Sequence, residues 1–162
     1  MKLKRALSPG TTTYAVVQGD HVCLITCRMS LARLIHMDKV VHFEIPADNL
    51  ARAKKFYNTV FGWTMNDAPE FEYVMVGTVE SNEMGMPKEP GAINGGMLAR
   101  QEPVKSPVIT IDVKNIDQAA SVIEKNGGKI VRAKMPVGDM GFAAYFKDTE
   151  GNVIGLWQNA QE

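Results

Sequence analysis

The chain has 162 residues, of which 45% are hydrophobic and 22% charged, and its 18 basic residues balance 18 acidic ones. This length can bury one sizeable core, and the composition is that of an ordinary soluble protein. The zero net charge and the lack of a basic stripe with interleaved aromatic residues argue against a nucleic-acid partner, and no apolar run is long enough to span a bilayer. Cys23 and Cys27 have no second pair elsewhere, so they predict neither a disulfide framework nor a zinc site, and we expect a cytoplasmic protein.

The first 36 residues differ from the rest of the chain. They contain five basic residues against Asp20 alone, a net charge of +4, which leaves −4 for the remainder. The basic start lacks the apolar core of a signal peptide. Apolar stretches at 14–17 and 22–25 indicate a hairpin that is marginal by itself. We therefore predict an N-terminal extension over 1–36, poorly ordered or a marginal hairpin, with Met37 as a hypothetical native start.

Residues 37–102 form a first module that opens with a strand. In this strand His42 and Glu44 alternate with Phe43 and Ile45, so one face is polar and the other is apolar. The strand is followed by residues that recur at helical spacing, and Gly62 ends this predicted helix. The expected elements are a strand at 39–46, a helix at about 48–60, and strands near 63–66, 71–77 and 92–99.

Residues 103–162 form a second module that repeats the first. Leu50 corresponds to Ile116, a shift of 66 residues (116 minus 50). The expected elements are a strand at 108–113, a helix at about 115–126, and strands near 129–133, 141–147 and 152–158. The sequence thus predicts an α+β fold made of two βαβββ modules. The Gly- and Pro-rich segment 81–91 reads as a long loop, which explains most of the extra length of module one.

Three motifs carry a family resemblance over about residues 38–159. They are Phe56-Tyr57-x-x-Val60-Phe61-Gly62-Trp63, Gly95-Gly96-Met97, and the run from Tyr145 to Trp157. In this order, and with the duplication, the chain resembles the vicinal oxygen chelate superfamily, the group of glyoxalase I and the bleomycin-resistance proteins. The resemblance implies a curved mixed sheet that forms a cup, with helices on the convex side and the ligand in the cup. It also implies a homodimer, with the 81–91 loop as one contact.

The same resemblance implies where a metal would bind. Metal enzymes of the family take one ligand from the first strand and one from the last strand of each module. His42 occupies the first such position, but its counterpart Val108 cannot coordinate an ion, and the last strands offer Gly95, or its neighbour Met97, and Gly155. We therefore expect no metal and no other cofactor, with a divalent metal as the alternative.

The polar face of the first strand gives the candidate catalytic residues. A histidine side chain can titrate near physiological pH, and Glu44 projects to the same face as His42, so the pair is a candidate base and orienting carboxylate. It is equally a candidate contact for the polar end of a ligand. Alternation in the other strands puts further residues in the cup as candidate ligand contacts: Met97, Val108, Thr110, Asp112, Tyr145 and Trp157. It turns another set toward the helix: Ile109, Ile111, Val113, Phe146, Ile154 and Leu156.

These observations favour a glyoxalase-like protein that lacks the full family metal site and binds a small organic molecule, as a sequestering protein for a toxic or antibiotic compound would. One alternative is an enzyme, either a metal-dependent or an acid–base lyase or isomerase resembling glyoxalase I, a lactoylglutathione lyase. Another is a dimeric structural or partner-binding module whose cup has lost its ligand.

Overall fold

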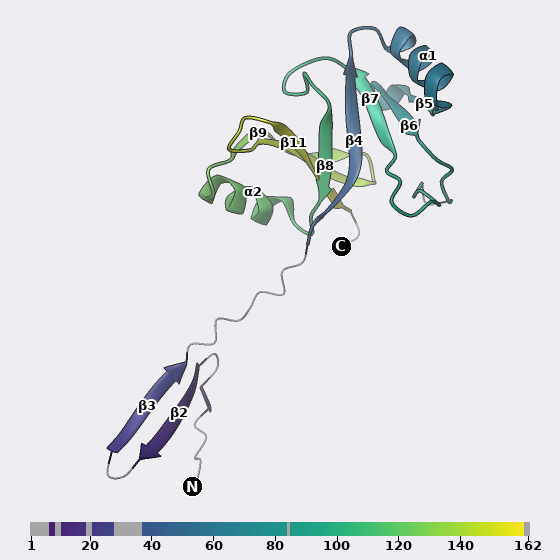
Figure 1. Ribbon diagram of the computed structural model, residues 1–162. Coiled ribbons are helices and arrows are strands. Elements are labelled where there is room, and N and C mark those ends of the chain that lie inside the picture. The colour runs from purple at the N-terminus through teal and green to yellow at the C-terminus, as the bar shows by residue number, and fades with distance from the viewer. Residues whose placement is uncertain (1–6, 9–10, 19–20, 28–36, 84, 161–162) are drawn as a thin grey trace. The chain divides into compact units, whose positions relative to one another are not determined.

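Figure 1 shows the protein as a computed structural model, which describes residues 7–8, 11–18, 21–27, 37–83 and 85–160. The chain divides into two compact units, residues 1–37 and 38–162. In the first unit, β1 (Leu7–Ser8), β2 (Thr11–Gln18) and β3 (His21–Cys27) form a small sheet, and β2 pairs antiparallel with β3. The hairpin predicted over 14–25 is present with longer strands, and the rest of the predicted extension, apart from β1, lies outside the described residues.

The second unit is built from two βαβββ modules in one mixed sheet. The first module contains β4 (Lys39–Ala47), α1 (Leu50–Phe61), β5 (Thr64–Ala68), a 3-10 helix η1 (Pro69–Phe71), β6 (Tyr73–Gly77) and β7 (Gly95–Ala99). The second contains β8 (Val108–Asp112), α2 (Ile116–Lys125), β9 (Lys129–Val137), β10 (Gly141–Lys147) and β11 (Val153–Asn159). The strand order is β5-β6-β7-β4-β8-β11-β10-β9. The predicted α+β class and the duplicated modules are confirmed.

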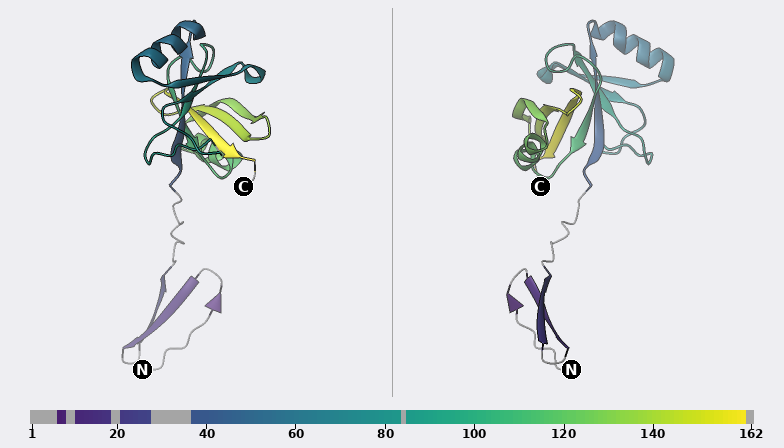
Figure 2. Two further views of the ribbon diagram at one scale, coloured as in Figure 1. Left: turned by 90° about the vertical axis from the view of Figure 1, so that its right-hand side faces the viewer. Right: turned by 60° about the vertical axis from the view of Figure 1, so that its left-hand side comes forward.

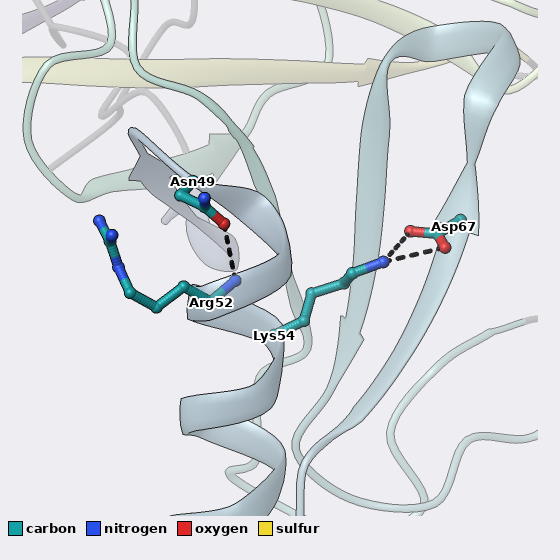
Figure 3. A network of polar contacts seen from close by, with 4 residues as sticks. All are labelled: Asn49, Arg52, Lys54 and Asp67. Atoms are coloured by element: carbon teal, nitrogen blue, oxygen red, sulfur yellow. Dashed lines mark hydrogen bonds and ion pairs between the residues drawn. The ribbon is translucent and has the colours of Figure 1, made fainter.

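Local sequence signals fix the helix ends. Asn49 and Asn115 cap α1 and α2, because their side-chain oxygens accept hydrogen bonds at 2.8 Å from the backbone N–H of Arg52 and Gln118, respectively. Figure 3 shows the cap of α1. Gly62 ends α1 with φ of +70°, a left-handed conformation that suits glycine and confirms the predicted end of this helix.

The two modules meet at the centre of the sheet, where β4 pairs antiparallel with β8. This register sets His42 opposite Thr110 and Glu44 opposite Val108. On the other side of each central strand lies the last strand of the same module, in parallel pairing, so that Glu44 stands beside Gly96 and Thr110 beside Gly155. The first strands of both modules are therefore neighbours.

The helices cover one face of the sheet, each over its own module (Figures 1 and 2). Under α2 the core contains the predicted helix-side residues Ile111, Val113, Phe146, Ile154 and Leu156. Under α1, the side chains of Phe43 and Ile45 pack with those of Leu50, Ala53 and Tyr57. The assignment of the two faces of the first strand is thus confirmed.

One predicted orientation and one predicted burial are wrong. Met97 was expected in the cup, but it is fully buried in the α1 core, because its register with Ile45 places it on the helix face. Ile109 was expected in the core, yet 46% of it is exposed. It pairs with Phe43 between the two modules, where the central strands leave part of the helix face uncovered.

A third core lies on the helix-free face. It consists of Leu98, Val104, Val108 and Tyr145, with Tyr73 and Met135 packed against it. Val104 comes from the linker between the modules and is 1% exposed. The linker is tied down by Arg100, which donates hydrogen bonds to Asp48 and to the carbonyl of Pro46 at 2.9 and 3.0 Å. The linker therefore fills part of the helix-free face with an apolar side chain.

Candidate functional site

The helix-free face holds a buried carboxylate at its centre. Glu44, from the central strand β4, is 7% exposed. The Tyr145 hydroxyl lies 2.9 and 3.0 Å from its two carboxyl oxygens, and the Tyr73 hydroxyl lies 3.3 Å from Oε1. Both tyrosines are in hydrogen-bond donor range of a group that would be costly to bury without partners. Glu44 is therefore the centre of a polar cluster.

The cluster exists only because the sheet is curled. Tyr73 comes from β6, two strands from β4, and Tyr145 comes from β10, three strands away on the other side. Three strand spacings in a flat sheet amount to roughly 14 Å, too far for a tyrosine hydroxyl to cross. Closure is also seen at the rim, where a Cβ added to Gly138 in the β9–β10 turn would lie 3.2 Å from the Phe71 ring of η1. The helix-free face is thus concave, as the resemblance implied.

Tyr73 also reaches a second side chain of the polar face. Its hydroxyl lies 2.8 Å from Nε2 of His42, which is half-buried on the same strand as Glu44. The ring passes directly over Gly96, where an added Cβ would lie 1.9 Å from the hydroxyl oxygen. Glycine at this position therefore makes room for Tyr73, which bridges His42 and Glu44.

Burial dominates the electrostatics of the cluster. It raises the pKa of Glu44, although hydrogen bonds from Tyr145 and Tyr73 and the charge of Arg132 act in the opposite direction. Burial lowers the pKa of His42 to about 4, so this imidazole is neutral at physiological pH. Burial and the charge of Glu44 raise the pKa of both tyrosines, whose hydroxyls remain donors.

Arg132 supports the cluster from the edge strand β9. Its guanidinium carbon lies 5.4 Å from the centre of the Tyr145 ring, and Nη2 donates a 2.7 Å hydrogen bond to the carbonyl of Glu102 in the linker. Arg132 is therefore placed between the linker and Tyr145. It positions the phenol that contacts Glu44 and does not itself contact the carboxylate.

The predicted site residues fall into three groups. His42 and Glu44 are brought together with Val108, Thr110 and Tyr145, and the last three are 1%, 7% and 6% exposed. Asp112 and Trp157 are paired across β8 and β11 and are half-buried, and the Trp157 indole donates to Asn159 at 2.9 Å. Met97 lies on the opposite face of the sheet. Whether any of these residues contacts a ligand stays a prediction.

Sequence reasoning missed Tyr73 and Arg132. Tyr73 stands in the predicted strand 71–77, and its alternation with buried Val74 and Val76 places it opposite the α1 core. Gly96 was visible in the Gly95-Gly96 pair as a site of close approach. Arg132 gave no comparable signal, because only the cross-strand register with Tyr145 brings it to the cluster.

The residues present do not fit a metal centre of the family type. Register corrects one detail of the prediction: Gly96 faces the cup beside Glu44, whereas Gly95 lies against the Phe43 ring on the helix face. Gly96, Val108 and Gly155 offer no side-chain ligand, and the oxygens of Glu44 are occupied by tyrosine hydroxyls. Over the described part of the chain, no group of three or more His, Cys, Asp or Glu side chains is placed to hold an ion.

Comparison with known proteins agrees with this architecture. Residues 39–78 match the family described as bleomycin resistance protein-like, N-terminal. A glyoxylase-like domain-containing protein of Didymella fabae is 32% identical over 118 residues, which cover 70% of this chain and 88% of that protein. The chain therefore belongs to the glyoxalase and bleomycin-resistance superfamily of vicinal oxygen chelate proteins, and it is a glyoxylase-like member.

A longer relative and solved structures extend the comparison. A Mycobacterium bovis protein described as a candidate glyoxylase, CFP32, is 27% identical to this chain over 121 residues. The match covers 71% of this chain but 43% of that protein, so the chain spans less than half the length of this relative. A hypothetical protein of Bacillus halodurans shares the fold with a TM-score of 0.54 at 15% identity, covering 77% of this chain and 96% of that one. A methylmalonyl-CoA epimerase of Streptomyces coelicolor does so with a TM-score of 0.53 at 17% identity, covering 76% and 95%.

Neither α1 nor α2 has the length and apolar character needed to cross a bilayer.

Proposed function

We propose that this glyoxylase-like protein binds a small organic molecule in the cup, without a resident metal of the family type, and sequesters it. The observation that carries the proposal is the convergence of Tyr73 and Tyr145 on Glu44, with His42 joined to it through Tyr73, within a mainly apolar concave face. Small-molecule sites have this character, a mainly apolar lining with a few convergent polar groups.

Exposure indicates which part of the cup a ligand reaches. Glu44, Thr110 and Tyr145 are buried, whereas His42, Asp112 and Trp157 are half-buried. The last three stand on the adjacent strands β4, β8 and β11, a span of roughly 10 Å across two strand spacings. The ligand therefore places a polar group at His42 and an apolar part against Trp157, with Glu44 behind His42.

One observation favours an acid–base enzyme as the second candidate. A buried carboxyl group whose pKa is raised, as that of Glu44 is, is a candidate for general acid–base catalysis. Against this role, Glu44 is nearly inaccessible and both of its oxygens are held by tyrosine hydroxyls. An enzyme would have to move Tyr73 or Tyr145 before Glu44 met a substrate.

A thermal-shift screen with small aromatic acids, amides and antibiotics tests the proposal, because a ligand of the native state raises the melting temperature. Trp157→Ala should weaken binding of a hit about tenfold or more, since it removes a large aromatic surface. Phe61→Ala is the control, because Phe61 is exposed on α1 at the other face. Equal losses in both variants would contradict binding in the cup.

Mass spectrometry of the hit after incubation separates the two candidates. An unchanged compound supports sequestration, whereas conversion that stops in Glu44→Gln supports the enzyme. If no compound stabilises the protein, the result favours the alternative that the protein is a structural or partner-binding module.

A further inference from the structure

The Tyr73 hydroxyl lies between two groups that can each accept a hydrogen bond from it. It lies 2.8 Å from His42 Nε2 and 3.3 Å from Glu44 Oε1. A phenol has a single proton, so it can donate to only one of these partners at a time. The direction of the hydrogen bonds through Tyr73 therefore has two alternatives.

In the first arrangement Glu44 is ionised. Tyr73 then donates to the carboxylate and accepts from Nε2–H of His42, which leaves Nδ1 as an acceptor. In the second arrangement Glu44 is protonated and donates to Tyr73, while Tyr73 donates to Nε2, so the imidazole proton is on Nδ1. Both arrangements satisfy the hydroxyl of Tyr73, and Tyr145 donates to Glu44 in either one.

The two arrangements differ by one proton. When Nδ1 takes up a proton from solvent, the Nε2 proton passes to Tyr73 and the Tyr73 proton passes to Glu44. Bonds to hydrogen form at Nδ1, at the Tyr73 oxygen and at Glu44, and bonds to hydrogen break at Nε2 and at the Tyr73 oxygen. The net change is the one proton taken up from solvent, and the imidazole is neutral before and after. The chain from His42 to Glu44 is thus a complete path for one proton.

We propose that Tyr73 couples the ionisation of buried Glu44 to the tautomer of half-buried His42, so that Nδ1 is an acceptor when Glu44 is ionised and a donor when Glu44 is protonated.

Few other charged groups face this path. Arg132 from β9 acts on Glu44 through its charge, and Tyr145 from β10 through its hydrogen bonds. The neighbouring strands β7 and β8 place Gly96, Val108 and Thr110 beside the pair, none of which titrates, and the carboxylate of Asp112 stands two residues beyond Thr110 on the same face of β8. Because burial raises the pKa of Glu44 and lowers that of His42 to about 4, Glu44 changes charge while His42 stays neutral. The imidazole therefore responds to Glu44 by changing its tautomer.

The coupling also defines the class of ligand, an assignment that rests on the proposed function, whereas the coupling itself does not. Within the described residues, the hydrogen bond to Tyr73 is the one that His42 makes through its ring nitrogens, so Nδ1 is left for a ligand. A ligand with an acceptor at this point, such as a carbonyl or carboxylate, favours protonated Glu44 and binds with uptake of one proton. A ligand with a hydroxyl or amine donor favours ionised Glu44.

The coupling can be measured without a ligand. In protein labelled with 15N-histidine, the shifts of Nδ1 and Nε2 report the tautomer, and a 13C label on the Glu44 carboxyl reports its ionisation. Variant His42→Gln assigns the His42 signals among those of the three histidines. We expect the proton to move from Nε2 to Nδ1 as pH falls, with the same midpoint as the carboxyl titration.

Two tyrosine variants form a matched pair. In Tyr73→Phe the His42 tautomer should no longer follow the ionisation of Glu44, because the bridge is gone. In Tyr145→Phe, which removes the other phenol from Glu44, the coupling should persist with its midpoint at higher pH, because the carboxylate loses a donor.

A tautomer that stays fixed through the Glu44 titration of the wild type would overturn the proposal, as would a coupling that survives in Tyr73→Phe. Either result leaves ligand binding in the cup untouched, and a failed ligand screen leaves the coupling untouched. For acceptor compounds that do bind, affinity should rise as pH falls in the wild type and not in Tyr73→Phe. The reverse pH dependence would overturn only the assigned class of ligand and would leave the coupling between Glu44 and His42 intact.

Discussion

The two modules share a topology but contribute differently to the cup. Module one provides His42, Glu44 and Tyr73, and module two provides Tyr145. At the shift of 66, His42 corresponds to Val108 and Glu44 to Thr110 (108 minus 42, 110 minus 44). The repeat therefore sets the frame of the sheet, while single substitutions at equivalent positions decide which module carries the polar chemistry.

The helices differ in the same way. In α2, Ile116 is 1% exposed and anchors the helix to its core, whereas α1 has no buried residue and leaves Phe56, Val60 and Phe61 each more than half exposed. Short helices depend on tertiary packing for their stability. Module one thus combines the polar cluster on one face with an incompletely covered helix on the other.

The largest effect is expected where the modules are alike. Met97→Ala in the α1 core and Leu156→Ala in the α2 core should each lower the free energy of unfolding by about 2–5 kcal/mol, since both side chains are buried. Met75→Ala, at a methionine that is 44% exposed, is the control and should cost less. Chemical denaturation measures all three. A small loss in only one core variant would mean that one module carries the stability.

The polar cluster should give module one a pH signature that module two lacks. Burial raises the pKa of Glu44, so its contribution to stability is present below the unfolded value and is lost as pH rises through the folded value. The pKa of His42 falls from 6.5 to about 4, so its contribution is present above 6.5 and is lost as pH falls toward 4.

Two variants separate these opposing terms. Relative to wild type, His42→Gln should lose the part of stability that rises with pH between 4 and 6.5, on the order of 3 kcal/mol, and Glu44→Gln should lose the part that falls with rising pH. Denaturation at several pH values measures the slopes. Thr110→Val in module two is the control and should keep both wild-type slopes; loss of the same slopes in this variant would contradict the assignment to module one.

Glycines beside the two central strands offer a closer comparison. Gly96→Ala would place Cβ 1.9 Å from the Tyr73 hydroxyl, and Gly155→Ala would place it 2.6 Å from Thr110 Oγ1. The tyrosine ring must leave Glu44, whereas the threonine can rotate, so we expect a loss of about 1–3 kcal/mol for Gly96→Ala and a smaller loss for Gly155→Ala. Thermal denaturation ranks the two, and the opposite order would show that Tyr73 is free to move.

The exposed side of α1 gives an expectation for assembly. If the homodimer implied by the family resemblance uses this helix, Phe56→Glu should weaken it at least tenfold, since a charge would enter an apolar contact. The exposed Val122 of α2 provides the control Val122→Glu. Light scattering at micromolar concentration measures the mass of each. Loss of the dimer only in Val122→Glu would indicate that the dimer contact lies on module two. A monomeric wild type would contradict the expected homodimer.

The smallest effects are expected at the surface ion pairs that join the helix of each module to the strand that follows it. Lys54 donates to Asp67 at 2.7 Å in module one (Figure 3), and Lys134 lies 3.0 Å from Asp117 in module two. Both carboxylates are largely exposed, so Lys54→Met and Lys134→Met should each cost less than about 1 kcal/mol, and less still at high salt. A larger, salt-independent loss would show that the lysine stem matters through packing.

The sequence by itself determined the modules and most of their faces. Period-two alternation placed His42 and Glu44 opposite Phe43 and Ile45, and Gly62 marked the end of α1, because these features depend on local backbone geometry. The repeat and the family motifs supplied the rest of the topology. Local rules were sufficient wherever a strand had one clearly apolar face.

Only the tertiary structure decided which side chains meet. Tyr73 and Tyr145 are 72 residues apart (145 minus 73), and they converge on Glu44 because the sheet curls and Gly96 leaves room for a ring. The orientation of Met97 and the exposure of Ile109 follow from register and from the gap between the helices, which no local pattern encodes. Contacts across several strands depend on curvature, and curvature is a property of the whole sheet.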